Sequence, residues 1–200
     1  EIHERLVGSE MCIRDRKINN PSQAVKNGIA LVPEERRKEG VLVNENVTLN
    51  LSAAALSKFC NGSFVSKAKT EKNAHEYVEG LDIKTPSIKQ HVKNLSGGNQ
   101  QKAIVAREID KNPELLVAVQ PTRGLDVGAI EYIHKQLVAQ RDAGKAVLLV
   151  SLELDEVMDV PDRILVMYEG EIVGELDPKA TTQEELGLYM AGAKRDEVKA

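Results

Sequence analysis

The stretch LSGGNQQK, residues 95–102, decides how the rest of this sequence is interpreted. Ser96 can cap a helix that runs to about Asp110, because a serine hydroxyl accepts a hydrogen bond from a backbone N–H of the first helical turn. Gly97 and Gly98 leave the N–H groups of that turn uncovered at the positive end of the helix dipole. The arrangement favours an anion, above all a phosphate. Taken alone, Ser-Gly-Gly is as typical of a flexible turn before a helix.

A second polar stretch, QPTRGLD at residues 120–126, follows an apolar run that is typical of a strand, Leu115–Val119. A helix over Val127–Arg141 and another strand over Lys145–Ser151 come next. Two strands joined by a helix in this way lie parallel, with a right-handed crossover. The sequence therefore predicts an α/β fold of three layers, with a mainly parallel sheet and an embedded helical subdomain at about residues 45–110.

The other expected elements are short and are bounded by Gly, Pro or capping residues. Further helices are expected over Asn20–Asn27, Asn46–Leu56, Ser66–Glu79, Glu153–Val160 and Thr181–Ala191. A buried strand is expected at Ile29–Val32, a polar loop at Lys58–Ser63, and an antiparallel hairpin at the sheet edge from Arg163–Tyr168 and Glu171–Glu175. The charged tail, residues 193–200, is expected to fray.

Composition narrows the class of protein. A length of 200 residues suits one domain, and the net charge of −4 argues against a nucleic-acid partner, which needs a basic surface. The two cysteines and four histidines have no ligand spacing, so we expect no disulfide framework and no metal site. We expect a reducing cytoplasm, because the sequence shows no signal peptide and no apolar run long enough to span a membrane. Any work at a membrane would depend on a partner.

Three stretches together carry a family resemblance: LSGGNQQK, QPTRGLDVGA at residues 120–129, and PEERRKEG at residues 33–40. Their wording and order resemble the ATP-binding cassette (ABC) ATPases over about residues 20–176. In detail they are similar to the second cassette of the tandem-cassette ATPases that energise simple-sugar and nucleoside importers. The resemblance implies the P-loop NTPase-like fold of an ABC cassette.

The resemblance also implies roles for particular residues. Ser96, Gly97, Gly98 and Asn99 would close over the γ-phosphate of an ATP whose other contacts, with Mg²⁺, come mainly from a partner cassette. Residues 124–126 (Gly124, Leu125 and Asp126) match the D-loop, which crosses between cassettes, although Asp126 is also an ordinary helix cap. The loop containing Glu34, Glu35 and Arg36 falls where the family contacts its permease, and a solvated loop is an equal alternative.

Other positions depart from the family pattern. A P-loop, G-x-x-x-x-G-K-[ST], does not occur in the 200 residues. The strand over residues 115–119 should end in an Asp for Mg²⁺ followed by a catalytic Glu, but it ends in Val119 and Gln120. The switch position after Ser151 holds Leu152 instead of His. Valine cannot support a metal and glutamine cannot take a proton from water, so no intact catalytic residue is expected.

Residues 1–16 have no sensible periodicity and resemble a non-native segment rather than the strand, glycine loop and helix that should precede Asn20. We expect a partial nucleotide-binding domain at residues 17–192, with truncation upstream as the reason for the missing P-loop. The departures at Val119, Gln120 and Leu152 would remain.

The expected function is therefore the ATP-binding second cassette of a bacterial importer, at the cytoplasmic face of the membrane and inactive as an isolated fragment. Its partners would be a first cassette, normally on the same polypeptide, transmembrane permease subunits and, indirectly, a substrate-binding protein. The alternatives are a non-hydrolytic regulatory scaffold and, less favoured, a soluble ABC protein without a transport role. The sequence SLELDE at residues 151–156 resembles that of the nucleoside importers, so it favours nucleosides over sugars as the transported substrate, without identifying one.

Overall fold

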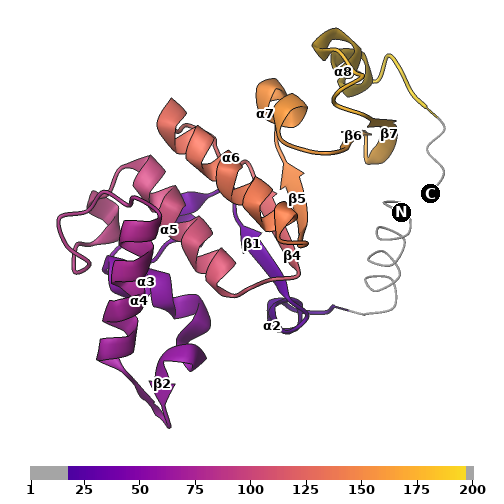
Figure 1. The fold of residues 1–200 in the computed structure, drawn as a ribbon. Coiled ribbons are helices and arrows are strands. Elements are labelled where there is room, and N and C mark those ends of the chain that lie inside the picture. The colour runs from indigo at the N-terminus through magenta and orange to yellow at the C-terminus, as the bar shows by residue number, and fades with distance from the viewer. Residues whose placement is uncertain (1–17, 197–200) are drawn as a thin grey trace.

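The computed structural model describes residues 18–196, and the segment 1–16 discussed above lies outside them. Figure 1 shows a short central sheet between two helical regions, with α3, α4 and β2 on one side and α8 with the β6–β7 hairpin on the other. The helices are α2 (Pro21–Lys26), α3 (Val47–Ser52), α4 (Lys67–Gly80), α5 (Gly97–Asp110), α6 (Val127–Asp142), α7 (Leu154–Asp159) and α8 (Gln183–Met190). The strands are β1 (Ile29–Val32), β2 (Cys60–Asn61), β3 (Phe64–Val65), β4 (Leu115–Val119), β5 (Ala146–Val150), β6 (Ile164–Tyr168) and β7 (Glu171–Leu176).

The central sheet has the order β1-β4-β5 and is parallel throughout. Ile29 pairs with Leu115 at one end, and Val119 pairs with Val150 at the other. The order β4, α6, β5 confirms the predicted parallel unit, and α5 packs on β1 while α6 packs on β5. The carboxyl end of β4 leads through residues 120–126 into α6, whose start lies against the start of α5.

The main core joins the sheet to the helical subdomain. It contains residues of β1, β4, α3, α5 and α6, among them Val32, Leu51, Ile104, Leu116 and Ile133, each at most 1% exposed. Burial on this scale, about 25 cal/mol per Å² of apolar surface, holds the two parts of the domain together.

Side-chain caps set where most of the described helices begin, as predicted for Ser96 and Asp126. Ser96 caps α5, Ser66 caps α4, Asn20 caps α2 and Asp126 caps α6 by accepting a bond from a backbone N–H three residues on. These caps explain why the predicted starts of the helices were accurate.

Two predictions in the helical subdomain were wrong in detail. The helix expected to reach Leu56 ends at Ser52 and continues as 3₁₀ turns that break at Ala55 (φ −134°, ψ 34°). The segment expected as a polar loop, Lys58–Ser63, instead contributes β2 to a small hairpin with β3. Gly62 supplies the positive φ of 63° that the tight turn needs.

The strand at Ile29–Val32 is buried on one face only, because Leu31 remains 49% exposed. The hairpin of β6 and β7 is antiparallel, as predicted, but its placement at the edge of the main sheet was wrong. It forms a separate two-stranded sheet whose inner face packs on α8 through Leu186 and Tyr189, in a second core. Within residues 18–196, β5 therefore has a strand neighbour on one side only.

The predicted fraying of the tail was wrong as far as Asp196. Its backbone N–H donates to the Val173 carbonyl at 2.8 Å, and its carboxylate accepts from the Tyr189 hydroxyl at 2.6 Å. The guanidinium of Arg195 lies 5.4 Å from the centre of the Tyr168 ring. These contacts fasten the first charged residues of the tail to the second core, while residues 197–200 lie outside the described part.

Candidate functional site

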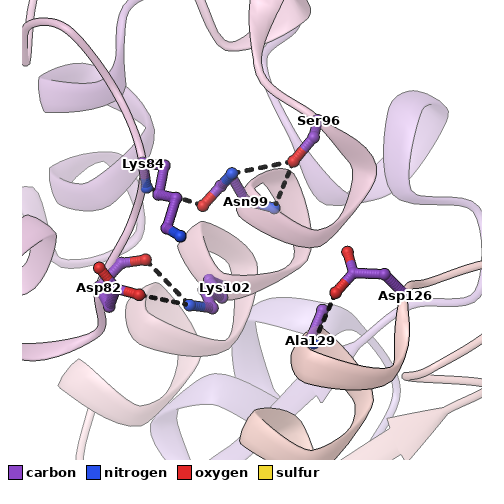
Figure 2. Close-up of polar contacts among 7 residues, drawn as sticks. All are labelled: Asp82, Lys84, Ser96, Asn99, Lys102, Asp126 and Ala129. Atoms are coloured by element: carbon purple, nitrogen blue, oxygen red, sulfur yellow. Dashed lines mark hydrogen bonds and ion pairs between the residues drawn. The ribbon is translucent and has the colours of Figure 1, made fainter.

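The start of α5 presents the hydroxyl of Ser96 at the surface. Its oxygen accepts from the Asn99 side-chain N–H at 2.9 Å and from the Asn99 backbone N–H at 3.4 Å (Figure 2). Both contacts use the hydroxyl as an acceptor, so its own hydrogen remains able to donate to an incoming anion. The backbone N–H groups of Gly97 and Gly98 lie in the first helical turn, where a helix offers no acceptor of its own.

Asn99 joins this turn to the loop that precedes it. Its side-chain oxygen accepts from the backbone N–H of Lys84 at 2.8 Å, while its amide nitrogen holds Ser96 (Figure 2). The sequence predicted a direct contact between Asn99 and nucleotide. The geometry shows that most of its amide is already engaged, and that it orients the Ser96 hydroxyl.

One turn further along α5, Lys102 is almost buried and braces the same loop. Its ammonium donates to the Asp82 carbonyl at 2.9 Å (Figure 2). It also lies 4.5 Å from the centre of the Tyr132 ring on α6. Burial, and to a lesser extent Asp82, raise the pKa of Tyr132 to about 12. The sequence gave no sign of this role, because a lysine on a helix is usually solvated.

The residues predicted to form a D-loop, 124–126, lie against the start of α5. The Asp126 carboxylate caps α6 by accepting from the Ala129 N–H at 2.9 Å (Figure 2). A Cβ added at Gly98 would come within 2.9 Å of the Ala129 Cβ, and one at Gly97 within 3.8 Å of Leu125. Gly98 therefore has no room for a side chain, and Gly124 has the positive φ of 66° that favours glycine.

The loop after β1 was predicted either to face a permease or to be solvated, and part of it contacts Arg123, directly before the predicted D-loop. Glu34 pairs with the side chain of Arg123, and Arg36 donates to the Arg123 carbonyl at 2.6 Å. Glu35 remains exposed, 3.8 Å from the ammonium of Lys38. The loop continues as one π-type turn, Arg36–Gly40, in which Gly40 lies against Ile104 of α5.

The three residues predicted to depart from a catalytic pattern lie at or just after the carboxyl ends of the strands. Val119 ends β4, and the Gln120 N–H donates to the Val150 carbonyl at 2.8 Å. Gln120 has a positive φ of 48°, which is uncommon for a residue other than glycine and often marks a functional turn. Leu152 is 75% exposed. The backbone turn after β4 is formed, but the side chains of Val119, Gln120 and Leu152 include neither a metal ligand nor a proton acceptor.

A buried polar group that sequence reasoning missed lies behind the D-loop. The Glu156 carboxylate on α7 is 3% exposed and accepts from the Thr122 hydroxyl at 3.0 Å. The same oxygen lies 2.8 Å from Nε2 of His134 on α6. The network ties α6 and α7 to the D-loop, and no local pattern joins three residues so far apart in sequence.

No helix within residues 18–196 combines the length and the apolar character needed to cross a bilayer. In the same part of the chain, no group of three or more His, Cys, Asp or Glu side chains could hold a metal ion.

Comparison with known proteins agrees with this geometry. The family model described as "ABC transporter" matches residues 6–123, more than half of the chain. The chain belongs to the ABC transporter family.

Curated relatives of this ABC chain include importer components. It is 45% identical over 189 residues to the guanosine import ATP-binding protein NupO of Bacillus subtilis, which covers 92% of this chain and 37% of that protein. The nucleoside import ATP-binding protein NupA of Lactococcus lactis is 43% identical, with the same coverage. The ribose import ATP-binding protein RbsA of Clostridium tetani is 44% identical over 183 residues, 90% of this chain and 36% of that protein. This ABC chain thus spans little more than a third of the length of these relatives.

Solved structures show the same fold. The dimeric structure of MJ0796, a bacterial ABC transporter cassette, superposes with a TM-score of 0.68 at 22% identity over 84% of this chain and 70% of that one. A post-hydrolysis dimer of the same cassette, bound to ADP and Pi, gives a TM-score of 0.66 at 21% identity, over 82% of this chain and 70% of that one. At this level of identity the similarity establishes an ABC cassette fold.

Proposed function

We propose that this chain is the second cassette of a longer bacterial import ATPase, and that it supplies the signature face of an ATP site shared with a first cassette. Nucleosides or simple sugars are the proposed cargo, since the relatives named above import guanosine, nucleosides and ribose. Their greater length leaves room for a first cassette on the same polypeptide.

The observation that carries the proposal is the start of α5. The Ser96 hydroxyl accepts both Asn99 donors and keeps its own hydrogen free. The N–H groups of Gly97 and Gly98 lie beside it at the positive end of the helix. These three groups suit the terminal phosphate of a nucleotide. The partner cassette would hold the remainder of the ATP and the Mg²⁺, which supplies charge neutralisation on the phosphates when bound.

The strand ends of this chain support a division of labour between the cassettes. Val119 offers no ligand to a metal, Gln120 has no basic oxygen, and Leu152 cannot exchange a proton. These side chains do not suit Mg²⁺, and we propose no step of hydrolysis through them. The residues that cleave ATP would belong to the first cassette.

Among residues 18–196, no strand pairs with the outer edge of β5, and this supports the proposal that further polypeptide completes this domain. Leu148 and Val150 on this strand are 49% and 45% exposed. An apolar strand with one free edge is a site where another strand can pair. We propose that the strand leading into a P-loop, from the same longer polypeptide, occupies this edge.

The proposed partners follow from an import role. Permease subunits would dock on the cassettes from the membrane, which places this chain at its cytoplasmic face. A substrate-binding protein would deliver the cargo on the other side. A regulatory scaffold that closes over ATP without supporting hydrolysis remains the second candidate, because the loss of chemistry at Val119, Gln120 and Leu152 favours it.

The decisive experiment changes Ser96 in the full polypeptide that carries this chain. We expect Ser96→Arg to reduce ATPase activity at least a hundred-fold, because a bulky cation displaces the phosphate from the helix end. Ser96→Asp preserves the helix cap, since aspartate caps as well as serine, but its negative charge repels the phosphate. It should therefore lose activity at an unchanged melting temperature.

The matched control is Ser63→Arg in the exposed turn of the β2–β3 hairpin, which should leave ATPase activity unchanged. If both Ser96 variants hydrolyse ATP at the normal rate, the signature face does not complete an ATP site and the proposal is wrong. The isolated chain should show neither measurable ATPase activity nor tight ATP binding, and tight binding by calorimetry would contradict the assignment of the nucleotide to the partner.

A further inference from the structure

The loop after β1 contacts Arg123, the residue directly before the predicted D-loop (residues 124–126), from two sides. The Glu34 carboxylate pairs with the Arg123 guanidinium, and the Arg36 guanidinium donates through Nη1 to the Arg123 backbone carbonyl at 2.6 Å. The residues of each pair are 89 and 87 positions apart in sequence. The loop and the D-loop therefore approach each other as parts of the tertiary fold, with no local turn to hold them.

The second edge of the Arg36 guanidinium faces the start of the signature helix. Its Nη2 lies 3.5 Å from the place where a Cβ at Gly97 would stand, and 3.9 Å from the equivalent place at Gly124. The Arg36 side chain thus extends from its own loop into the space between the D-loop and the first turn of α5.

This placement is electrostatically unfavourable for Arg36. Burial lowers the pKa of Arg36, and the neighbouring Arg37 and Arg123 lower it further. No ion pair to a carboxylate involves Arg36 within residues 18–196, because Glu34 pairs with Arg123 and Glu35 with Lys38. Packing and the hydrogen bond to the Arg123 carbonyl therefore keep the Arg36 guanidinium between the two loops. In a fully solvated loop, the guanidinium would lie in water instead.

We propose that Arg36 is a positioning residue that fixes the D-loop against the signature helix, so that both reach the shared ATP site in one arrangement. The inference rests on the proposed function of Ser96 and deepens it. The Glu34–Arg123 pair acts in the same direction from the other side of the D-loop.

The test compares Arg36→Gln with Arg37→Gln in the full polypeptide. Arg37 is the adjacent, exposed cation, so its substitution changes the charge of the loop equally without touching the D-loop. We expect Arg36→Gln to lower kcat about ten-fold, the loss of one charge-assisted hydrogen bond, while the KM for ATP changes less than two-fold. Arg37→Gln should alter neither value. Arg36→Lys should recover part of kcat, because an ammonium can still donate to the Arg123 carbonyl.

A second pair of variants tests the other half of the contact. Arg123→Glu places two carboxylates opposite each other and should lower kcat, and the exchange Glu34→Arg with Arg123→Glu should restore it. A purely structural role would instead lower the melting temperature and the fraction of active protein, with kcat per active site unchanged.

The results separate this inference from the proposed function. Loss of activity in the Ser96 variants with normal kcat in Arg36→Gln would overturn the role of Arg36 and leave the ATP site in place. Equal effects of Arg36→Gln and Arg37→Gln would also overturn it, since only loop charge would then matter. Normal activity in the Ser96 variants would contradict the shared ATP site itself.

Discussion

The start of α5 and the carboxyl ends of β4 and β5 lie near each other in the fold but depend on their side chains in different ways. At the start of α5, Ser96, Gly98 and Asn99 each contact a neighbouring segment. At the strand ends, the side chain of Leu152 is exposed, whereas Gln120 is buried. The turn at the start of α5 is therefore built into the packing of the domain, whereas the side chain of Leu152 can change with little effect on the fold.

Gln120, directly after β4, combines a constrained backbone with a side chain that lacks catalytic chemistry. Its backbone keeps a positive φ and a hydrogen bond to β5, as a turn that presents a catalytic group would require. Its side chain is an amide that cannot act as a base at neutral pH. The geometry of the strand end is thus separable from its chemistry.

The largest effect expected within this comparison is at Gly98. In Gly98→Ala the new methyl group would come within 2.9 Å of the Ala129 Cβ and 3.2 Å of the Asp126 carboxylate, so α5 or α6 must shift. We expect a loss of about 2 kcal/mol in the free energy of unfolding of the chain, measured by urea denaturation. Gly97→Ala is the matched control: its nearest neighbour would be 3.5 Å away, and we expect a change below about 0.5 kcal/mol.

Equal losses at the two glycines would show that flexibility of the turn, and not close packing, explains both residues. That result would remove the contrast between the signature turn and the strand ends.

Much of the fold could be predicted because its signals are local. Ser96, Ser66 and Asp126 are residue types that mark helix starts. The apolar runs at β4 and β5, with a helix between them, predict two parallel strands. The short β2–β3 hairpin was missed because strands of two residues carry no periodicity. The position of the β6–β7 hairpin was missed because pairing between strands depends on what lies beside them, which a hairpin pattern does not record.

The candidate site was predictable in its residues but not in its contacts. The motif predicted Ser96 and the two glycines as site residues, and the residue types at 119, 120 and 152 predicted the absence of catalytic groups; both stay predictions. That Asn99 holds Lys84, or that Arg36 reaches Arg123, could not be read from sequence because these pairs are 15 and 87 residues apart. A buried lysine such as Lys102 also contradicts the usual expectation for its residue type.

A smaller effect is expected at Tyr132, which supports the signature turn through Lys102. In the part of the chain that the structure describes, its buried hydroxyl has no hydrogen-bond partner. Tyr132→Phe removes that hydroxyl and keeps the ring beneath the ammonium, so we expect stability at pH 8 to be unchanged or to rise by about 1 kcal/mol.

The raised pKa of Tyr132 adds a pH dependence with a definite sign. The folded chain favours the neutral phenol, so this contribution is complete below pH 10 and is lost as the pH rises through about 12. Tyr132→Phe should therefore gain relative to the unsubstituted chain between pH 8 and pH 11, in urea denaturation at each pH. A constant difference across that range would mean that Tyr132 titrates normally and is open to water.

The smallest effect is expected at the strand ends, where Leu152→His restores the residue type of the family switch. Leu152 is 75% exposed, so the change should alter the free energy of unfolding by less than about 0.5 kcal/mol. It should also fail to give the isolated chain any ATPase activity, because Val119 and Gln120 still lack a metal ligand and a base. Thermal denaturation and a phosphate-release assay measure the two outcomes. A loss of several degrees in Tm would show that Leu152 is part of the packing after all, and the strand ends would then be as constrained as the start of α5.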